Sequence, residues 1–484
     1  MFFNSIDFAI FLPIVFILYW FVTQRNLKLQ NFLIVAASYL FYGWWDWRFL
    51  SLILISTIVD YSLGIRLYKE ENLTKRKVLL WISILVNLGF LGFFKYYNFF
   101  LENFINAFSL FGAEIKVNSL NIVLPVGISF YTFQTLSYTI DVYKRKLEPT
   151  KDFIAFSAFV SFFPQLVAGP IERATHLLPQ FYTKRTFDYS KAVDGMRQIL
   201  WGLFKKIVIA DNCGKYADLI FNNSSDYSGS TLVFGALFFT FQIYGDFSGY
   251  SDIAIGTSRL FGFDLMRNFA FPYFSRDIAE FWRRWHISLS TWFRDYLYIP
   301  LGGSRGGSWM KVRNTFIIFI VSGFWHGANW TFIIWGALNA IYFLPLLLTK
   351  NNRKNLDIVA QGKYFPSFKE LSFMLVTFGL TVVAWIFFRA ENIDHAISYL
   401  SEILSYSLFT EPEFPGKSES LNTIIWVIGF VIIEWLGREQ EYAIANLGRK
   451  WKIPFRYIIY YLMIIAIIMS SDQQQGQRFI YFQF

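Results

Sequence analysis

The chain has 484 residues, of which 55% are hydrophobic, 21% aromatic and only 16% charged. A soluble domain carries about a quarter charged residues, so this composition excludes a water-soluble globular protein. Apolar windows of about 20 residues recur along the chain, which predicts a polytopic α-helical membrane protein and not a barrel of short alternating strands. The net charge of +10 comes from Lys and Arg placed largely in loops between apolar runs, so no nucleic-acid partner is expected.

The N-terminal third contains five apolar runs long enough to be membrane spans. Basic residues gather after the first, third and fifth runs, so these three loops lie on one side if every run crosses once. The positive-inside rule then places the N-terminus outside and the basic loops in the cytoplasm. The five runs occupy 8–22, 30–43, 49–65, 79–94 and 120–140.

Residues 150–310 form shorter segments that are broken by Gly and Pro and are rich in Arg and Trp. AGPIER (168–173) predicts a helix break followed by a polar turn. The stretch 276–298 is too charged to span and predicts an amphipathic helix at the membrane interface. Non-helical backbone at membrane depth is tolerated only where protein or a water-filled cavity surrounds it, so we expect an internal chamber.

Four further apolar segments follow, at 314–349, 370–388, 421–437 and 455–470. The expected fold is therefore one all-α membrane domain, residues 1–484, with about ten to twelve spans plus re-entrant and surface helices. The segment 314–349 contains no Asp, Glu, Lys or Arg. As one helix it would reach about 50 Å, well beyond a bilayer core of about 30 Å, so we expect it to break near Gly323 and Gly327.

His326 lies close to the centre of that charge-free segment. Ionisable residues at membrane depth are costly and are candidates for function, and histidine is suited to moving protons near neutral pH. Position alone leaves open a second interpretation, in which His326 only hydrogen-bonds a neighbouring helix. His286, beside Arg283 and Arg284 in the amphipathic stretch, is the second candidate.

Polar side chains in two other apolar segments predict the wall of a cavity. Gln134 lies in the polar-lined span 124–144, and Asp246 and Ser248 lie in YGDFSGYSD (244–252). Asp246 could face a cavity, pair with a cation or cap a helix. The chain has no metal-ligand spacing and a single cysteine, so neither a metal nor a permanently bound cofactor is expected.

Taken together, five segments resemble the membrane-bound O-acyltransferase family, and in particular its bacterial branch for alginate O-acetylation and D-alanyl transfer. The C-terminal helices 370–484, with the ending RFIYFQF (478–484), are more similar to the polysaccharide-acetylating members. The five segments lie in order within a family core of 124–336: LPVGISFYTFQTLSYTIDVY (124–143), FFPQLVAGPIER (162–173), YGDFSGYSDIAIG (244–256), FWRRWHISLSTWFRDYLYIPLGGSR (281–305) and SGFWHGANWTFIIWG (322–336).

The resemblance implies a ring of tilted helices around a central tunnel, with the donor entering from the cytoplasm and the acceptor from outside. It implies that His326 and His286 are catalytic. The chemistry of a thioester suits His326 as general base, and an acyl intermediate on His326 is left open without being implied. The tunnel residues would be Asp246, Ser248, Gln134, Trp325 and Asn329, with His286 or Asn329 polarising the thioester carbonyl. Coenzyme A phosphates would meet Arg283, Arg284 and Arg294, although these arginines would equally suit lipid headgroups.

The expected function is transfer of an acetyl group from cytoplasmic acetyl-CoA across the inner membrane. The acceptor would be a hydroxyl of an exopolysaccharide or wall glycan, reached through an extracytoplasmic SGNH-type partner protein. Three alternatives stay open: a lipid O-acyltransferase, D-alanyl transfer to a wall polymer, and a channel or transporter that uses His326 as a proton relay.

Overall fold

The computed structural model describes residues 1–112, 119–167, 169–449 and 451–471. These residues form helices joined by loops, without a β-strand, which confirms the all-helical fold class. Residue 168 of the AGPIER segment and the ending 478–484 lie outside the described residues. The chain groups into two compact units, the first of Met1–Ala192 with Thr257–Met266 and the second of Val193–Gly256 with Arg267–Phe484. The single domain stays a prediction.

Six described segments are long and apolar enough to cross a membrane, which makes this an integral membrane protein. Most of the expected spans coincide with these segments or with the shorter apolar helices Ile6–Val22 and Phe153–Leu166. The total of about ten to twelve spans stays a prediction. The six are Leu27–Lys69, Leu73–Ser109, Trp330–Leu348, Phe368–Arg389, Lys417–Gly437 and Ile453–Ser471.

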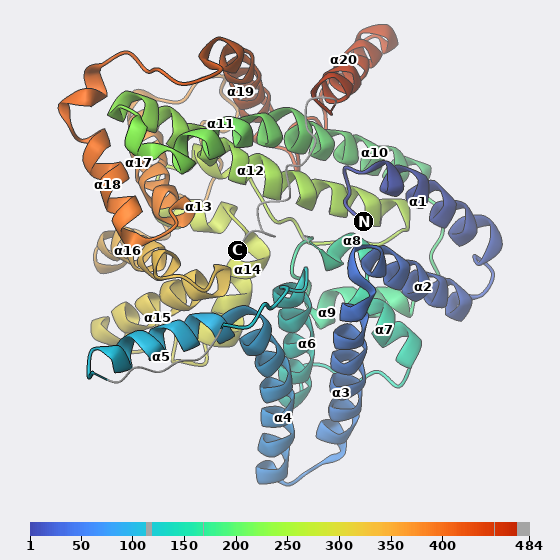
Figure 1. Ribbon diagram of the computed structural model, residues 1–484. Helices are drawn as coiled ribbons and strands as arrows, with labels where there is room; N and C mark the ends of the chain where they lie inside the picture. The colour runs from blue at the N-terminus through green and yellow to red at the C-terminus, as the bar shows by residue number, and fades with distance from the viewer. Residues whose placement is uncertain (113–118, 168, 450, 472–484) are drawn as a thin grey trace. The chain divides into compact units, whose positions relative to one another are not determined.

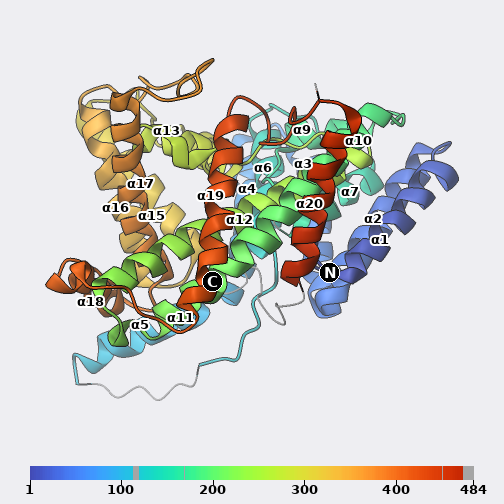
Figure 2. The ribbon, with the colours of Figure 1, turned by 90° about the horizontal axis from the view of Figure 1, so that it is seen from above.

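The first unit is built around a bundle in which α3, α4 and α6 lie side by side (Figures 1 and 2). Gly127, at φ 74°, precedes α6, so the expected span 120–140 is extended in its first part and helical only from Ile128. The helices of this unit are α1 (Ile6–Ile17), α2 (Leu27–Asp46), α3 (Leu50–Lys69), α4 (Leu73–Leu91), α5 (Tyr97–Ser109), α6 (Ile128–Tyr143), α7 (Phe153–Ser161), α8 (Phe163–Leu166) and α9 (Ala174–Leu177).

A fully buried carboxylate holds this bundle together. Asp60 of α3 accepts hydrogen bonds from the Ser83 hydroxyl at 2.5 Å and the Asn87 amide at 2.8 Å, both of α4. It also accepts one from the Thr139 hydroxyl of α6 at 3.0 Å. Because a buried carboxylate is costly without hydrogen-bond donors, these contacts fix the three helices in one register.

The second unit contains the helical hairpin of α15 and α16, with α17 packed beside α16 (Figures 1 and 2). Its helices are α10 (Tyr189–Leu203), which begins in the first unit, α11 (Asp211–Asn222), α12 (Gly229–Leu260), whose last turn belongs to the first unit, α13 (Ile278–Arg284), α14 (Ile287–Phe293), α15 (Ser308–His326), α16 (Trp330–Leu348), α17 (Phe368–Arg389), α18 (Ile393–Ile403), α19 (Lys417–Gly437) and α20 (Ile453–Ser471).

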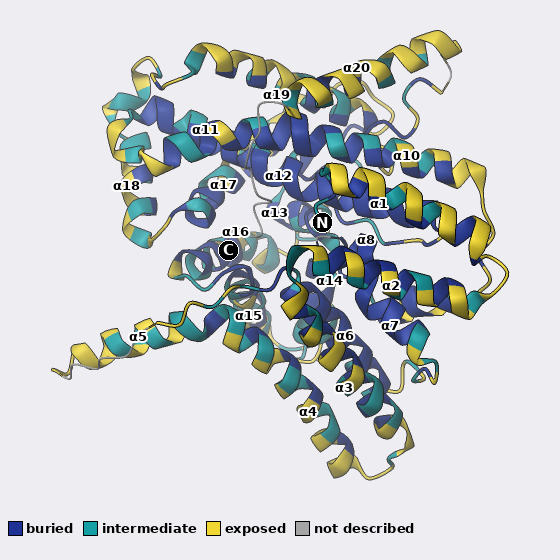
Figure 3. Ribbon diagram, turned by 45° about the vertical axis from the view of Figure 1, so that its right-hand side comes forward, coloured by how far each residue is buried: buried dark blue, intermediate teal, exposed yellow. Residues whose placement is uncertain are grey.

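The candidate spans of the second unit differ in how much of each is covered by protein (Figure 3). Only 11% of the apolar window in Ile453–Ser471 is buried, against 44% in Phe368–Arg389. The large apolar side chains that α20 exposes therefore suit contact with lipid, whereas α17 is covered by protein over more of its surface.

The single amphipathic helix expected for 276–298 is wrong in its detail. Two seven-residue helices, α13 and α14, occupy the stretch and are separated at Trp285 and His286. The Phe281, Trp285 and Phe293 side chains are buried in protein. Tertiary packing has overridden the local amphipathic pattern here.

The Asp60 network predicts a specific loss of stability. Replacing Asp60 with Ala leaves three buried donors without their acceptor, which should lower the free energy of unfolding of the first unit by roughly 2–4 kcal/mol. Thermal unfolding in detergent measures this as a fall in the apparent melting temperature. Asp7→Ala removes an exposed carboxylate of the same unit and should change it far less. Equal effects of the two substitutions would contradict this account.

Candidate active site

His326 is the last residue of α15, at a break in the long apolar segment. Gly327 leaves the helix with an extended backbone, and Asn329 caps α16 by accepting a hydrogen bond from the Thr331 amide at 3.0 Å. The predicted break is therefore confirmed, within a residue or two of Gly327. The hairpin packs closely at Gly323 and Gly336, because a Cβ on either would overlap a backbone carbonyl of the facing helix, that of Phe332 or of Phe319.

Aromatic rings surround the His326 imidazole, which is 3% exposed. The ring centroids of Trp325, Trp335 and Phe388 lie 4.9, 5.2 and 5.3 Å from it, each in an edge-on arrangement. Trp335 comes from α16 and Phe388 from α17, so three helices build the enclosure. An imidazole in such a low-dielectric setting is a strong electrostatic partner for any charge that develops beside it.

His286 lies at the turn between α13 and α14 and adopts the left-handed conformation, with φ 43° and ψ 55°. This conformation is uncommon for a residue other than Gly and is found mostly where the surrounding structure imposes it. Asn268 imposes it here, because its backbone oxygen accepts from the Ile287 amide at 2.9 Å and its side-chain oxygen contacts His286 Nδ1 at 3.1 Å. Burial lowers the pKa of His286 well below its ordinary value.

The tertiary structure brings the two histidines to one place through Trp325. The Trp325 ring lies 4.9 Å from the His326 ring and 6.1 Å from the His286 ring, measured between centroids. Phe247 of α12 packs edge-on against His286 at 4.5 Å. Two buried imidazoles that are 40 residues apart in sequence thus both pack against one indole, and we take this arrangement as the candidate active site.

The acidic cluster on α12 is engaged in ion pairs. Asp246 pairs with Lys206 at 2.7 Å, and the same ammonium group contacts Asp211 at 2.7 Å. All three side chains are buried. Ser248 donates to the Tyr244 carbonyl one helical turn earlier, at 2.6 Å. Of the interpretations left open for Asp246, the structure therefore supports pairing with a cation, and the tunnel roles of both residues stay predictions.

Two other predicted tunnel residues make structural hydrogen bonds. Asn329 uses its oxygen to cap α16 and donates from its amide nitrogen to the Glu391 carbonyl at 2.7 Å. Gln134, in the first unit, donates to the Phe159 carbonyl at 2.6 Å and accepts from the Gln165 amide at 3.0 Å. These hydrogen bonds do not test whether either side chain contacts substrate, so both tunnel roles stay predictions.

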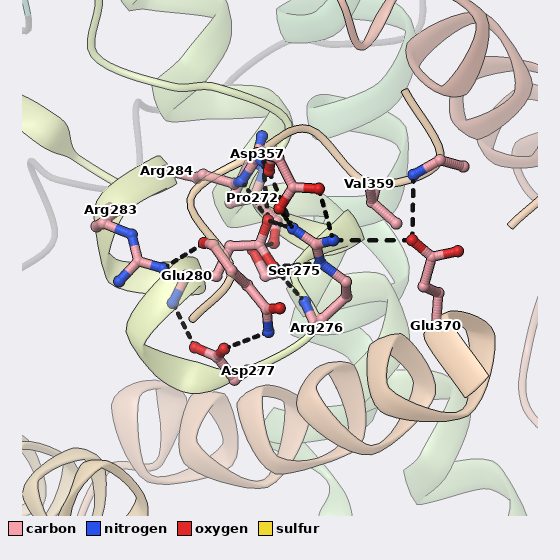
Figure 4. Close-up of polar contacts among 12 residues, drawn as sticks. Pro272, Ser275, Arg276, Asp277, Glu280, Arg283, Arg284, Asp357, Val359 and Glu370 are labelled. Atoms are coloured by element: carbon pink, nitrogen blue, oxygen red, sulfur yellow. Dashed lines mark hydrogen bonds and ion pairs between the residues drawn. The ribbon is translucent and has the colours of Figure 1, made fainter. Parts of the chain in front are cut away.

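Of the three predicted donor-binding arginines, two are bound to a loop of the same unit (Figure 4). Arg283 donates to the carbonyls of Asn352 and Asn355, and Arg284 donates to the Glu280 carboxylate at 2.8 Å and to the Asp357 carbonyl at 3.0 Å. Arg294 pairs with the adjacent Asp295 at 2.8 Å, and its side chain is 58% exposed. Arg294 is therefore the most accessible of the three to a phosphate.

Several residues that shape the site could not be singled out from the sequence. Trp335 and Phe388 look like ordinary apolar residues of spans, and only the packing of α16 and α17 places them against His326. Asn268 lies in an irregular stretch, 18 residues before the histidine that it contacts. The available signal for Asn268 was a polar residue among aromatic ones, which does not indicate that its partner is His286.

The close approach of α15 and α16 generates a prediction about Gly323. A single methyl group at this position must push the facing helix away, so Gly323→Ala should destabilise the second unit by about 1–3 kcal/mol. The matched control is Gly379→Ala in α17, where an added Cβ meets nothing within 4 Å. That change should be neutral or slightly stabilising, because Ala favours the helix. Thermal unfolding of both variants tests this, and a neutral Gly323→Ala would show that the hairpin has room to adjust.

Comparisons with known proteins identify the family of this chain. The model of the MBOAT, membrane-bound O-acyltransferase, family matches residues 142–378. The probable alginate O-acetylase AlgI of Pseudomonas putida is 37% identical over 99% of both chains, and that of Azotobacter vinelandii is 39% identical over 91% of this chain and 85% of the relative. The peptidoglycan O-acetyltransferase of Helicobacter pylori is 35% identical over 81% of this chain and 77% of its own length. The chain belongs to the membrane-bound O-acyltransferase family and is an O-acyltransferase.

Proposed function

We propose that this protein transfers an acetyl group from cytoplasmic acetyl-CoA to a hydroxyl of an extracytoplasmic polysaccharide. The observation that carries the proposal is the pair of buried imidazoles, His326 and His286, that both pack against Trp325 in a chain of this family. The similarity to proteins named alginate O-acetylase and peptidoglycan O-acetyltransferase supports a glycan acceptor. A tunnel between the two sides of the membrane is part of the proposal.

The chemistry needs little more than proton transfer and positioning. His326 takes the proton of the acceptor hydroxyl as its oxygen attacks the thioester carbonyl, an effect worth about 10²–10⁴-fold. The new C–O bond forms and the C–S bond breaks, so coenzyme A leaves as a thiolate that is then protonated. The aromatic enclosure of His326 excludes water from the reacting atoms, which protects the thioester from hydrolysis.

The donor is proposed to bind through its phosphates on the cytoplasmic side. Arg294 is the best-placed of the predicted arginines, because a phosphate meets an exposed guanidinium there whose partner is one neighbouring carboxylate. A phosphate at Arg283 or Arg284 would instead have to displace hydrogen bonds to loop carbonyls and to Glu280. The acetyl group is proposed to pass to the glycan through an extracytoplasmic SGNH-type partner.

One cavity favours a second candidate, a lipid O-acyltransferase. An apolar cavity of about 260 Å³ lies between α12, α17 and α19, and its lining includes Phe378, Phe430 and Leu375. The Leu375 side chain is 62% exposed, so the cavity meets the outer face of a candidate span. A lipid chain suits this opening. Incubating the protein in vesicles with labelled acetyl-CoA and extracting the lipids distinguishes the two, since label in the lipid fraction supports the second candidate.

The proposed function predicts that His326→Ala abolishes transfer in a protein that still folds and inserts. We expect turnover to fall by about 10²–10⁴-fold, measured as coenzyme A thiol released from acetyl-CoA in the presence of alginate or peptidoglycan fragments. His395→Ala is the matched control, because His395 contacts Ser224 and lies outside the site. Turnover by His326→Ala at the wild-type rate would remove His326 from the mechanism.

A further inference from the structure

We infer that Asn268 is a positioning residue that holds neutral His286 in the tautomer with its proton on Nδ1, so that Nε2 is a proton acceptor. This inference rests on the proposed function for its catalytic consequence, but the tautomer itself follows from hydrogen-bond geometry alone. It also changes the role that the resemblance allowed for His286, because a neutral imidazole with its proton on Nδ1 cannot donate from Nε2 to a thioester carbonyl.

The first step is the orientation of the Asn268 amide. The backbone N–H of Ser288 points at one end of this amide at 3.3 Å, and a backbone N–H can only donate. The end that faces Ser288 must therefore be the oxygen, Oδ1. Nδ2 then faces the Ser251 hydroxyl at 3.0 Å, which can accept. Asn268 is fully buried, so no alternative partner in water competes with this arrangement.

The second step is the proton on His286. Nδ1 lies 3.1 Å from Asn268 Oδ1, and an oxygen that only accepts requires a donor on the ring nitrogen. The Ser288 hydroxyl does not replace that donor, since it lies 2.8 Å from Oδ1 but 3.5 Å from Nδ1 and has one proton to give. Nδ1 therefore carries the proton. In the neutral ring the lone pair is then on Nε2, on the side of the ring away from Asn268.

The third step is the reason that Asn268, 18 residues away in sequence, holds the His286 ring. α14 begins directly after His286, and its first amides need acceptors because a helix leaves its N-terminal N–H groups without internal partners. Asn268 supplies its backbone oxygen to Ile287 and its side-chain oxygen to Ser288. One residue thus caps the helix, imposes the left-handed conformation of His286 and selects the tautomer. Rotation of the imidazole would break its own hydrogen bond from Nδ1 to Asn268 Oδ1.

For the reaction, a fixed Nε2 lone pair makes His286 a proton acceptor beside His326. It can accept a hydrogen bond from a neighbouring hydroxyl of the glycan and so orient the glycan, while His326 takes the one proton of the hydroxyl that attacks. Selecting the wrong tautomer of a catalytic histidine is costly even when the geometry is kept, as the Asp-to-Asn change in the serine-protease triad illustrates with a loss of about 10⁴-fold. We therefore expect a large fall in kcat when Asn268 is replaced by an apolar residue.

The direct test is the nitrogen chemical shift of His286 in the intact protein. The chain has four histidines, so 15N-histidine labelling in detergent or vesicles gives few signals, and the His286 signal is assigned by its loss in His286→Gln. At neutral pH the wild type should show a protonated Nδ1 and an unprotonated Nε2. A proton on Nε2 in the wild type overturns the inference, whatever the variants do and whether or not glycan transfer is detected.

Variants then connect the tautomer to turnover. Asn268→Leu should give the other tautomer or a mixture and lower kcat by about 10²-fold or more, with a smaller change in KM. Asn268→Asp keeps an oxygen towards His286 Nδ1 and Ser288. It should therefore keep the proton on Nδ1 and most of the turnover that Asn268→Leu loses. Asn339→Leu removes another buried amide of the same unit, which accepts from Trp282, and should leave the His286 tautomer unchanged.

The outcomes separate the two proposals. An altered tautomer in Asn268→Leu with unchanged turnover refutes the catalytic role of Asn268. An unaltered tautomer in that variant refutes the inference that Asn268 holds the tautomer of His286. If Asn268→Leu does not fold, the wild-type signal and Asn268→Asp still decide. A correct tautomer pattern in a protein that transfers no acetyl group leaves the inference standing on its own and counts against the proposed function.

Discussion

Backbone groups at helix breaks in a membrane protein must find partners inside the protein, because lipid offers none. The second unit meets this constraint with two asparagines of its own sequence, one distant from the helix that it caps and one directly before it. Asn268 accepts from the first amides of α14, and Asn329 accepts from the first turn of α16. Each capped helix begins within four residues of one of the two buried histidines, α14 at Ile287 and α16 at Trp330. The hydrogen bonds that cap these helices therefore also hold the chain breaks at which the histidines lie.

The same constraint explains three arginines of the stretch 276–298 together with Arg438. Backbone carbonyl groups of the loop between α16 and α17 accept hydrogen bonds from guanidinium groups. Arg283 donates to the carbonyls of Asn352 and Asn355. Arg438 donates to the carbonyls of Val359, Ala360 and Lys363. Arg276 and Arg284 share the buried Glu280 carboxylate and both donate to the Asp357 carbonyl. Arginine suits this work because its planar group carries five donors and stays charged. A cluster that resembles a phosphate site in sequence is thus in large part the support of a loop.

Burial sets the chemistry of the site as much as its geometry does. His286 is 1% exposed and His326 is 3% exposed, and aromatic rings pack against both. Removal from water disfavours the charged imidazolium, so His286 stays neutral and keeps a lone pair for accepting protons. The tight helix approach at Gly323 and Gly336 maintains this enclosure, since it brings Trp335 of α16 to His326.

The sequence by itself determined the fold class, most of the spans and the break beside His326. Those features follow from local composition, since apolar length, Gly placement and a lone ionisable group in a charge-free run act without distant partners. The sequence also singled out both histidines, through motifs that resemble a family. Only the tertiary structure decided that 276–298 forms two buried helices, that Asp246 pairs with Lys206, and that Trp325, Asn268 and Phe388 meet at the imidazoles. These contacts join segments up to 62 residues apart. Side-chain direction and helix packing, which a linear pattern does not contain, select each partner.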